Sequence, residues 1–301
     1  MTSHDIEFLC NLCGKSSTCP SLQLTRENPS CGSCGSSVRT RSLLRTLSLE
    51  LFQINLPVPD FPRLKSLRGL GISDSPQYAE ALSAKFDYRN TFHDRPPQFD
   101  LMKPPSSELG QYDFVIVSDV LEHVPPPAET GFHNAYALLK PGGVVVMSVP
   151  YSIEDSGTIE HFPQLNDFSV IEAGGRSVLL NRTADGALQV FENLVFHLGL
   201  TPSLEMREFS EHGLKQMLAS AGFDEIRWHG DGYPQFGIVW REPWSLPLAL
   251  RKGEAHFDAS AIRELMGEFA AANRRATASK SELHLLNQRR WVKLGRSLGT
   301  L

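Results

Sequence analysis

Two pairs of cysteines near the N-terminus have the spacing of a metal site. Cys10 and Cys13 form one Cys-x-x-Cys-Gly knuckle, and Cys31 and Cys34 form a second. Four thiolates suit tetrahedral zinc, and each following glycine permits a turn that directs backbone amides at sulfur. The spacing therefore predicts a structural zinc ribbon with no open coordination position. Cys19 is the fifth cysteine and could replace one of the four ligands.

The rest of the chain restricts the class of protein. It has 301 residues, 41% of them hydrophobic, and a formal net charge of −5, which is enough for a full α/β core with one small module. The mild acidity disfavours a nucleic-acid partner without excluding it. No apolar run approaches the ~20 residues of a membrane span, and residues 1–7 do not resemble a secretory signal. All cysteines are clustered, as in metal sites of reducing compartments, so we expect a cytoplasmic protein. The oligomeric state is not determined.

A glycine-containing turn follows the first apolar strand of the main domain. Residues 64–72 form this strand, which carries Gly69 and Gly71, and a helix over 77–86 follows Ser73. Glycines allow the backbone to approach a nucleotide-like ligand, and the start of a helix offers free amides. There is no third glycine for a pyrophosphate, which disfavours NAD.

Strands and helices then alternate. Further strands are predicted over 88–92, 113–117 and 144–149 and helices over 39–52 and 132–139, a pattern that indicates βαβ units and a parallel sheet. An insertion over 151–208 holds a hairpin of 176–183 and 187–191. A helix over 211–221 precedes two strands, 225–229 and 236–240, expected to pair antiparallel, and 258–297 is expected to be helical with a basic end. The fold class is α/β: a doubly wound, mostly parallel Rossmann-like sheet with a final antiparallel strand, plus a small N-terminal zinc ribbon. The expected domains are 1–40 (zinc ribbon), 41–62 (connecting helix and linker), 63–250 (main domain) and 251–301 (C-terminal helices).

Two motifs in the middle of the chain resemble a known family. YDFVIVSDVLEHV over 112–124 and LLKPGG over 138–143 are similar to the fourth strand, and to the approach to the fifth, of class I S-adenosylmethionine methyltransferases. The resemblance covers about residues 64–150 and implies S-adenosylmethionine as cofactor. By position it implies Gly69, Gly71 and Ser73 in the cofactor loop, Asp94 at the ribose, Asp100 at the adenine amine, and Ser118 and Asp119 beside the methionine part. The chain departs from the family pattern at Leu67, where an acid is usual, and at Ser73, where a glycine is usual.

The chemistry of methyl transfer needs alignment above all. A hydroxyl acceptor also benefits from a base, which contributes about 10²–10⁴ in rate. His123 follows the fourth strand at the edge where ligands bind in open sheets, so it is the catalytic candidate. The alternative is a histidine that packs over the cofactor without titrating. His161 and His197 in the insertion are each expected to be surface or packing residues.

The insertion and the segment 290–296 resemble bacterial methyltransferases of polysaccharide pathways. We therefore expect a methyltransferase that acts on a hydroxyl of a small molecule or glycan. One alternative is an RNA or protein methyltransferase whose zinc module recognises the macromolecule through a basic path from Arg39 and Arg45 to the glycine turn. Another is a non-catalytic scaffold without affinity for the cofactor. We expect the arginines near the zinc module to form a solvated basic face: Arg26, Arg39, Arg41 and Arg45.

Overall fold

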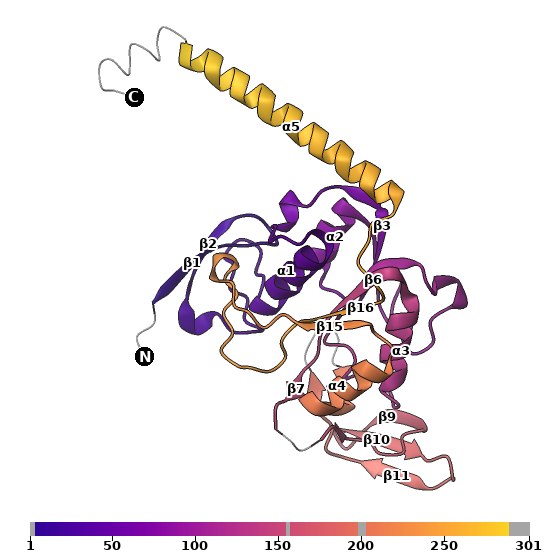
Figure 1. Cartoon of the computed structure of the whole chain (residues 1–301). Helices are drawn as coiled ribbons and strands as arrows, with labels where there is room; N and C mark the ends of the chain where they lie inside the picture. Colours follow the sequence, from indigo (N-terminus) through magenta and orange to yellow (C-terminus); the bar gives the residue numbers. More distant parts are fainter. Residues whose placement is uncertain (1–3, 155–156, 198–202, 289–301) are drawn as a thin grey trace.

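A six-stranded sheet forms the centre of the molecule (Figure 1). The computed structural model describes residues 4–154, 157–197 and 203–288. The strand order is β15-β16-β6-β5-β3-β4, and every neighbouring pair is parallel except the two that involve β16. The strands are β3 (Leu64–Ile72), β4 (Phe86–Thr91), β5 (Tyr112–Ser118), β6 (Leu139–Ser148), β15 (Glu225–Trp228) and β16 (Leu248–Arg251). The predicted fold class, a mostly parallel sheet with an antiparallel strand near its end, is confirmed.

Helices cover both faces of this sheet. Successive residues of β5 point to opposite faces, so Phe114 lies in one hydrophobic cluster and Val115 in the other. The first cluster joins the sheet to the N-terminal module and to α1 (Val38–Phe52) and α2 (Pro76–Lys85). The second joins it to α3 (Glu129–Leu138) and α4 (Glu211–Ser220). The hydroxyl oxygens of Ser37 and Ser210 accept hydrogen bonds from backbone amides in the first turns of α1 and α4, and so cap the N-termini of these two helices.

The insertion forms small sheets of its own. The predicted hairpin is present as β10 (Arg176–Arg182) and β11 (Leu188–Phe191), and β9 (Asp167–Ala173) extends it to three strands. The remaining short strands are β7 (Tyr151–Ser152), β8 (Ile159–Glu160), β12 (Phe196–His197), β13 (Ser203–Leu204) and β14 (Arg207–Ser210). The N-terminal module holds β1 (Asp5–Leu9) and β2 (Ser16–Pro20). Short 3-10 helices are η1 (Ser21–Gln23), η2 (Val58–Asp60), η3 (Ser106–Glu108) and η4 (Pro234–Phe236).

One predicted strand, 236–240, is wrong. Its first residue ends η4, and Gly237 follows in the left-handed region at φ 65°. A Cβ at Gly237 would lie 2.7 Å from the Phe8 ring, so this segment turns tightly against the zinc module instead of extending. The antiparallel partner of β15 is β16, further along the chain.

The C-terminal helix α5 (Ala259–Gln288) projects away from the domain (Figure 1). It is anchored near its start, where a carboxylate oxygen of Glu264 accepts hydrogen bonds from the Ser66 amide and hydroxyl at 3.0 and 2.8 Å. The basic end predicted for this region, and the segment 290–296, lie outside the described residues. No helix among those described is long and apolar enough to cross a membrane.

A buried charge cluster fastens α1 to the end of the sheet. The Glu50 side chain is 1% exposed, contacts the Arg251 guanidinium, and lies 3.1 Å from His229 Nε2 and 3.0 Å from Arg227. Burial by itself would raise the pKa of Glu50. The hydrogen bonds from His229 and Arg251 and the charges of the two arginines outweigh it, and lower the pKa to about 2.

We expect Glu50→Gln to reduce the free energy of unfolding by about 3 kcal/mol at neutral pH, because the folded state prefers the ionised carboxylate. A depressed pKa contributes stability above the unfolded value, and this is lost as the pH falls. The difference between wild type and variant should therefore shrink between pH 4.5 and about 2. Urea denaturation of both proteins at stepped pH measures it. A difference that does not change with pH would contradict an ionised Glu50.

Candidate functional site

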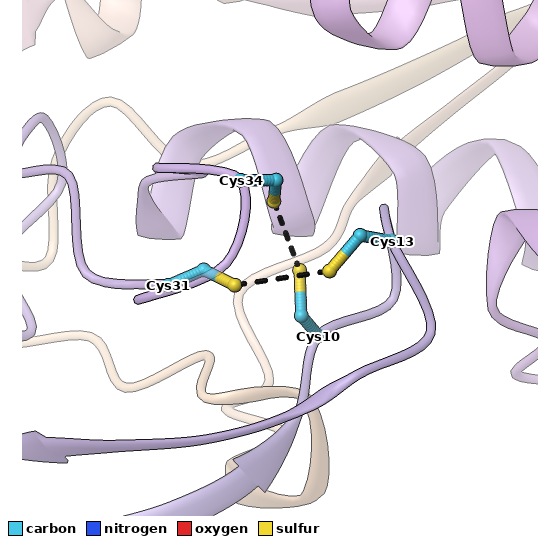
Figure 2. A group of neighbouring side chains, drawn as sticks. All are labelled: Cys10, Cys13, Cys31 and Cys34. Carbon is cyan, nitrogen blue, oxygen red and sulfur yellow. Dashed lines mark hydrogen bonds between the residues drawn. The ribbon is translucent and has the colours of Figure 1, made fainter.

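The four knuckle cysteines converge on one point (Figure 2). Cys10 and Cys34 have sulfurs 3.6 Å apart, and Cys13 and Cys31 have sulfurs 3.8 Å apart. Zinc–sulfur bonds of about 2.3 Å in tetrahedral geometry place the sulfurs about 3.8 Å from one another, so the cluster fits zinc. Each sulfur comes from a loop that the ribbon strands or the start of α1 hold in place.

The surroundings of the cluster match a closed zinc knuckle. Amides of Ser33 and Cys34 donate to the Cys31 sulfur, and the Ser36 hydroxyl lies 3.1 Å from Cys10 Sγ. Burial disfavours the Cys31 thiolate, but the two amides together with the Cys34 and Cys10 thiols outweigh burial and lower the pKa of Cys31 to about 6. The Cys19 sulfur is not part of the cluster and contacts the Pro20 carbonyl oxygen instead.

The arginines near the module do not form the solvated face that the sequence suggested. Arg41 is fully buried beneath the cysteines and donates to the Ser36 and Gly237 carbonyl oxygens at 2.6 and 2.9 Å. Arg45 is half-buried over the Tyr233 ring. Two others, Arg26 and Arg39, reach across to the carboxyl end of β5. Each of these guanidiniums contacts residues far away in the sequence, so Arg41 is buried and the other three are partly buried instead of lying on a solvated face.

Asp119 is the residue that these two arginines hold. Arg26 pairs with it through two hydrogen bonds of 2.7 and 2.8 Å, and Arg39 Nε lies 3.3 Å from its second oxygen. The Ser148 hydroxyl donates to it at 2.8 Å. Burial would raise the pKa of Asp119, but the two guanidiniums and this hydroxyl lower it to about 2, so the carboxylate stays ionised. Glu27 contacts both arginines from the solvent side.

Ser118 and Ser73 complete this edge of the sheet. Arg39 donates to the Ser118 hydroxyl at 2.8 Å. Ser73 follows β3, the strand next to β5, and its amide donates to Thr91 at the end of β4 at 2.7 Å. The chain leaves β3 towards β4 on one side and later returns to β5 on the other. This is the switch point where open sheets bind ligands.

The backbone is strained on both sides of the switch point. Ser73 has φ 59° and Asp119 has φ 51°, in the left-handed region that favours glycine. Ser73 replaces the third glycine of the resembled loop, yet it adopts a conformation that glycine takes easily. The departure therefore lies in the side chain and not in the path of the backbone. Such strain is concentrated at functional sites because the surrounding structure must enforce it.

Gly69 and Gly71 face a packed layer of aromatic side chains. A Cβ at Gly69 would lie 2.2 Å from the Phe114 ring, and one at Gly71 would lie 2.2 Å from the Tyr88 hydroxyl. The Tyr88 and Phe114 rings stack at 5.8 Å. Tight packing therefore explains why both positions are glycine, and the cofactor role of these two glycines stays a prediction.

The two acids predicted for the nucleoside end lie in the segment after β4. The Asp94 side chain is half exposed, 4.0 Å from Arg95. Asp100 is partly buried, and its carboxylate accepts from the Met102 amide at 2.8 Å. Phe92 forms only an isolated bridge with Gln98, so no third strand separates these acids from the edge within the described residues. Their contact with a ribose or adenine stays a prediction.

His123 lies where the loop after β5 meets the insertion. Its Nδ1 is 2.9 Å from the Leu204 carbonyl oxygen, and its ring meets the His197 ring edge-on at 5.1 Å. Burial is the main cause that lowers the pKa of His123, which favours its neutral imidazole. Burial, followed by the charge of Asp119, raises the pKa of the neighbouring Glu122 well above its usual value. His161 and His197 both contact the Glu205 carboxylate.

This edge fits the methionine part of S-adenosylmethionine. The amino acid end of the cofactor carries a carboxylate and an ammonium, and the edge offers two guanidiniums and an ionised Asp119. Arg39 is 29% exposed, and both Arg39 and Arg26 contact the exposed Glu27 carboxylate. The carboxylate of the cofactor can replace that of Glu27 as their partner. The sequence did not reveal the part played by Arg26 and Arg39, because their partner is 93 and 80 residues away, respectively.

Comparisons with known proteins gave a match to one family model and to several solved structures. The model of a methyltransferase-domain family matches residues 66–227, which is more than half of the chain. Similar solved structures include a didemethyltoxoflavin N1-methyltransferase from Burkholderia thailandensis (17% identity, TM-score 0.38, 72% of this chain and 81% of that chain). Another is an amino pentose methyltransferase from Micromonospora echinaspora (15%, 0.39, 72% and 92%). A third is a sugar N-methyltransferase from a Streptoalloteichus species (14%, 0.39, 69% and 85%). A comparison with curated proteins gave no match.

Removal of one knuckle ligand should release zinc. We expect Cys31→Ser to contain one zinc ion fewer per chain than wild type, because a hydroxyl is a poor replacement for a thiolate. Cys19→Ser should retain the full zinc content, since Cys19 lies outside the cluster. Elemental analysis after gel filtration measures both. A loss of zinc from Cys19→Ser alone would assign the ligands differently.

The strained backbone at Ser73 should lower the free energy of unfolding of the protein. We expect Ser73→Gly to leave the free energy of unfolding unchanged or to raise it by up to about 1 kcal/mol, because glycine accepts the left-handed region. Ser73→Val should lower it by about 1–3 kcal/mol, since a β-branched residue resists that conformation. Chemical denaturation measures both variants. Equal stabilities of the two would contradict the strained turn.

Proposed function

The chain belongs to the methyltransferase-domain family, and from that membership we propose that it transfers a methyl group from S-adenosylmethionine to a hydroxyl of a small molecule or glycan. The cofactor supplies a methyl group bound to a sulfonium, which is already a good leaving group. The protein then has to align the acceptor and to help its hydroxyl lose a proton. The observation that carries the proposal is the position of His123, which lies partly buried beside the carboxyl end of β5 with its Nδ1 2.9 Å from the Leu204 carbonyl oxygen of the insertion.

The cofactor would be held at the switch point. Arg39 and Arg26 would bind the carboxylate of its methionine part, with Asp119 keeping both guanidiniums in position. The backbone at Ser73 and the hydroxyl of Ser118 would line the same part. Gly69 and Gly71 would be adjacent, and Asp94 and Asp100 would take the ribose and the adenine. These roles follow from the family resemblance and from the place of each residue at the strand ends.

The acceptor would lie under the insertion. His123 stands at the start of this region, and the insertion contributes His197 from β12 and, from segments beside its short strands, His161 and Glu205. An imidazole that is neutral at pH 7 can take the acceptor proton itself, or it can bind a cation that lowers the pKa of the hydroxyl. A glycan offers several hydroxyls at once, which suits a group of imidazole and carboxylate partners. A place in polysaccharide biosynthesis would agree with this chemistry.

The alternative of RNA or protein recognition by the zinc module has less support. It requires a basic path from Arg39 and Arg45 to the glycine turn. Arg39 is occupied by Asp119 and Glu27, and the neighbouring Arg41 is buried. The net charge around Arg39 is therefore small, and the buried Arg41 interrupts the path between Arg39 and Arg45, so a phosphate backbone meets no continuous row of cations at these positions.

A titration with S-adenosylhomocysteine tests the cofactor half of the proposal. We expect wild type to bind it, and Arg39→Gln to bind it at least tenfold more weakly, because the carboxylate loses a charged partner. Arg176→Gln removes an exposed arginine at the start of β10 and should bind like wild type. Isothermal calorimetry measures the affinities, and thermal unfolding confirms that each variant is folded.

A folded wild type that does not bind S-adenosylhomocysteine would favour the non-catalytic scaffold instead. Where binding is found, the hydroxyl half is tested with nucleotide sugars and oligosaccharides as acceptors. The methylated atom is identified by mass spectrometry and NMR. Methylation of amines only, with no hydroxyl product, would overturn this half.

A further inference from the structure

A second cluster of metal-ligating side chains lies apart from the cysteines. Glu122, His123 and His197 each place one ligand atom within 4.8 Å of the others. His123 Nε2 is 3.7 Å from a carboxylate oxygen of Glu122. The first two residues belong to the loop after β5, and His197 ends β12 of the insertion. The insertion therefore completes a group that the sheet alone leaves unfinished.

Each histidine in this cluster already has one ring nitrogen engaged. His123 Nδ1 contacts the Leu204 carbonyl oxygen at 2.9 Å, which leaves Nε2 on the side of Glu122. His197 Nε2 contacts Glu205, which leaves Nδ1. The other oxygen of Glu205 lies 2.7 Å from His161 Nε2. Metal-ligating histidines are typically fixed in this way, with the second nitrogen bonded to a backbone carbonyl or a carboxylate.

Glu122 provides the second, independent observation. Its side chain is 1% exposed, and neither carboxylate oxygen has a hydrogen-bond partner among the described residues. A buried carboxylate without a partner costs several kcal/mol when ionised. A cation is the natural partner for such a group. Arg26 and Arg39 are directed at Asp119 and Glu27, whose two carboxylates balance their two charges, and neither arginine donates a hydrogen bond to Glu122.

We propose that Glu122, His123 and His197 bind a divalent transition-metal ion of the zinc type at the acceptor side of the site. Two imidazoles and one carboxylate form a three-ligand set that leaves coordination positions open, whereas the four thiolates form a closed one. The inference rests on the proposed function and deepens it, because the open position would receive the acceptor hydroxyl.

The reaction balances without any change of oxidation state. The ion would lower the pKa of a hydroxyl bound at its open position, and the proton of that hydroxyl would pass to water. Its oxygen forms a bond to the methyl carbon while the carbon–sulfur bond breaks. The electron pair of that bond stays on sulfur, so a neutral thioether leaves. His123 then acts as a ligand, and the ion activates the nucleophile.

The test uses the full chain and zinc alone as the probe. After equilibrium dialysis against micromolar Zn²⁺, wild type should bind two zinc ions per chain. Glu122→Gln and His197→Ala should each bind one. The matched control His212→Ala removes an exposed histidine on α4 and should bind two. X-ray absorption should show a mixture of sulfur and nitrogen or oxygen ligands in wild type and sulfur ligands alone in the first two variants. A wild type with one zinc ion and only sulfur ligands overturns the proposal.

Binding of S-adenosylhomocysteine to the same variants separates this proposal from the proposed function. We expect affinities within about twofold of wild type, because the ion would lie on the acceptor side. A tenfold loss in both variants would overturn that placement. Hydroxyl methylation by a wild type that binds one zinc ion would overturn the metal site alone. Two zinc ions without any hydroxyl product would overturn the proposed function and leave the metal site in place.

Discussion

The pairing of Arg26 with Asp119 is the contact on which the arrangement of the site depends. Asp119 is mostly buried at the end of a central strand, in a strained backbone conformation. A carboxylate in that place is tolerated only with charged and hydrogen-bonded partners. The two charged partners come from a loop between the cysteine knuckles and from the first turn of α1, and only the Ser148 hydroxyl comes from the sheet among the partners described above. The zinc ribbon is therefore one wall of the candidate site.

This dependence explains why the module shares a hydrophobic cluster with the sheet. Phe8, Cys10 and Val38 belong to the same cluster as Phe114 and Ile116 of β5. Beneath the cysteines, Arg41 fills the space with a fully buried guanidinium over the Phe8 ring. A ribbon that swung freely could not hold two arginines within about 3 Å of a carboxylate on another element. A zinc ion held by the four cysteines would fix the loops from which these side chains start, and would thereby link metal binding to the shape of the strand edge.

Local signals in the sequence predicted the elements well. The strand over 64–72 matches β3 residue for residue, and the helix predicted over 39–52 begins at Val38. Periodicity and capping residues determine such elements within a few turns of chain, which is why they could be read. The strand expected over 236–240 failed because Gly237 bends the chain against Phe8, a contact between residues 229 positions apart. For the same reason, the sequence did not reveal that Arg26 and Arg39 face inward, towards Asp119.

The two halves of the candidate site are built differently, and their construction suits different tasks. The cofactor side consists of central strand ends, a strained turn at Ser73 and charges fixed by the zinc ribbon. The geometry of this side is set by the parts of the fold that pack into the large hydrophobic cluster shared by the sheet and the N-terminal module. The side where we propose that the acceptor binds consists of the loop at His123 and two-residue strands of an insertion with only a small hydrophobic cluster. Every substrate of such an enzyme meets the same cofactor, so that side gains from rigidity. The acceptor side has to match one particular molecule, and an insertion held by few contacts can change without disturbing the sheet.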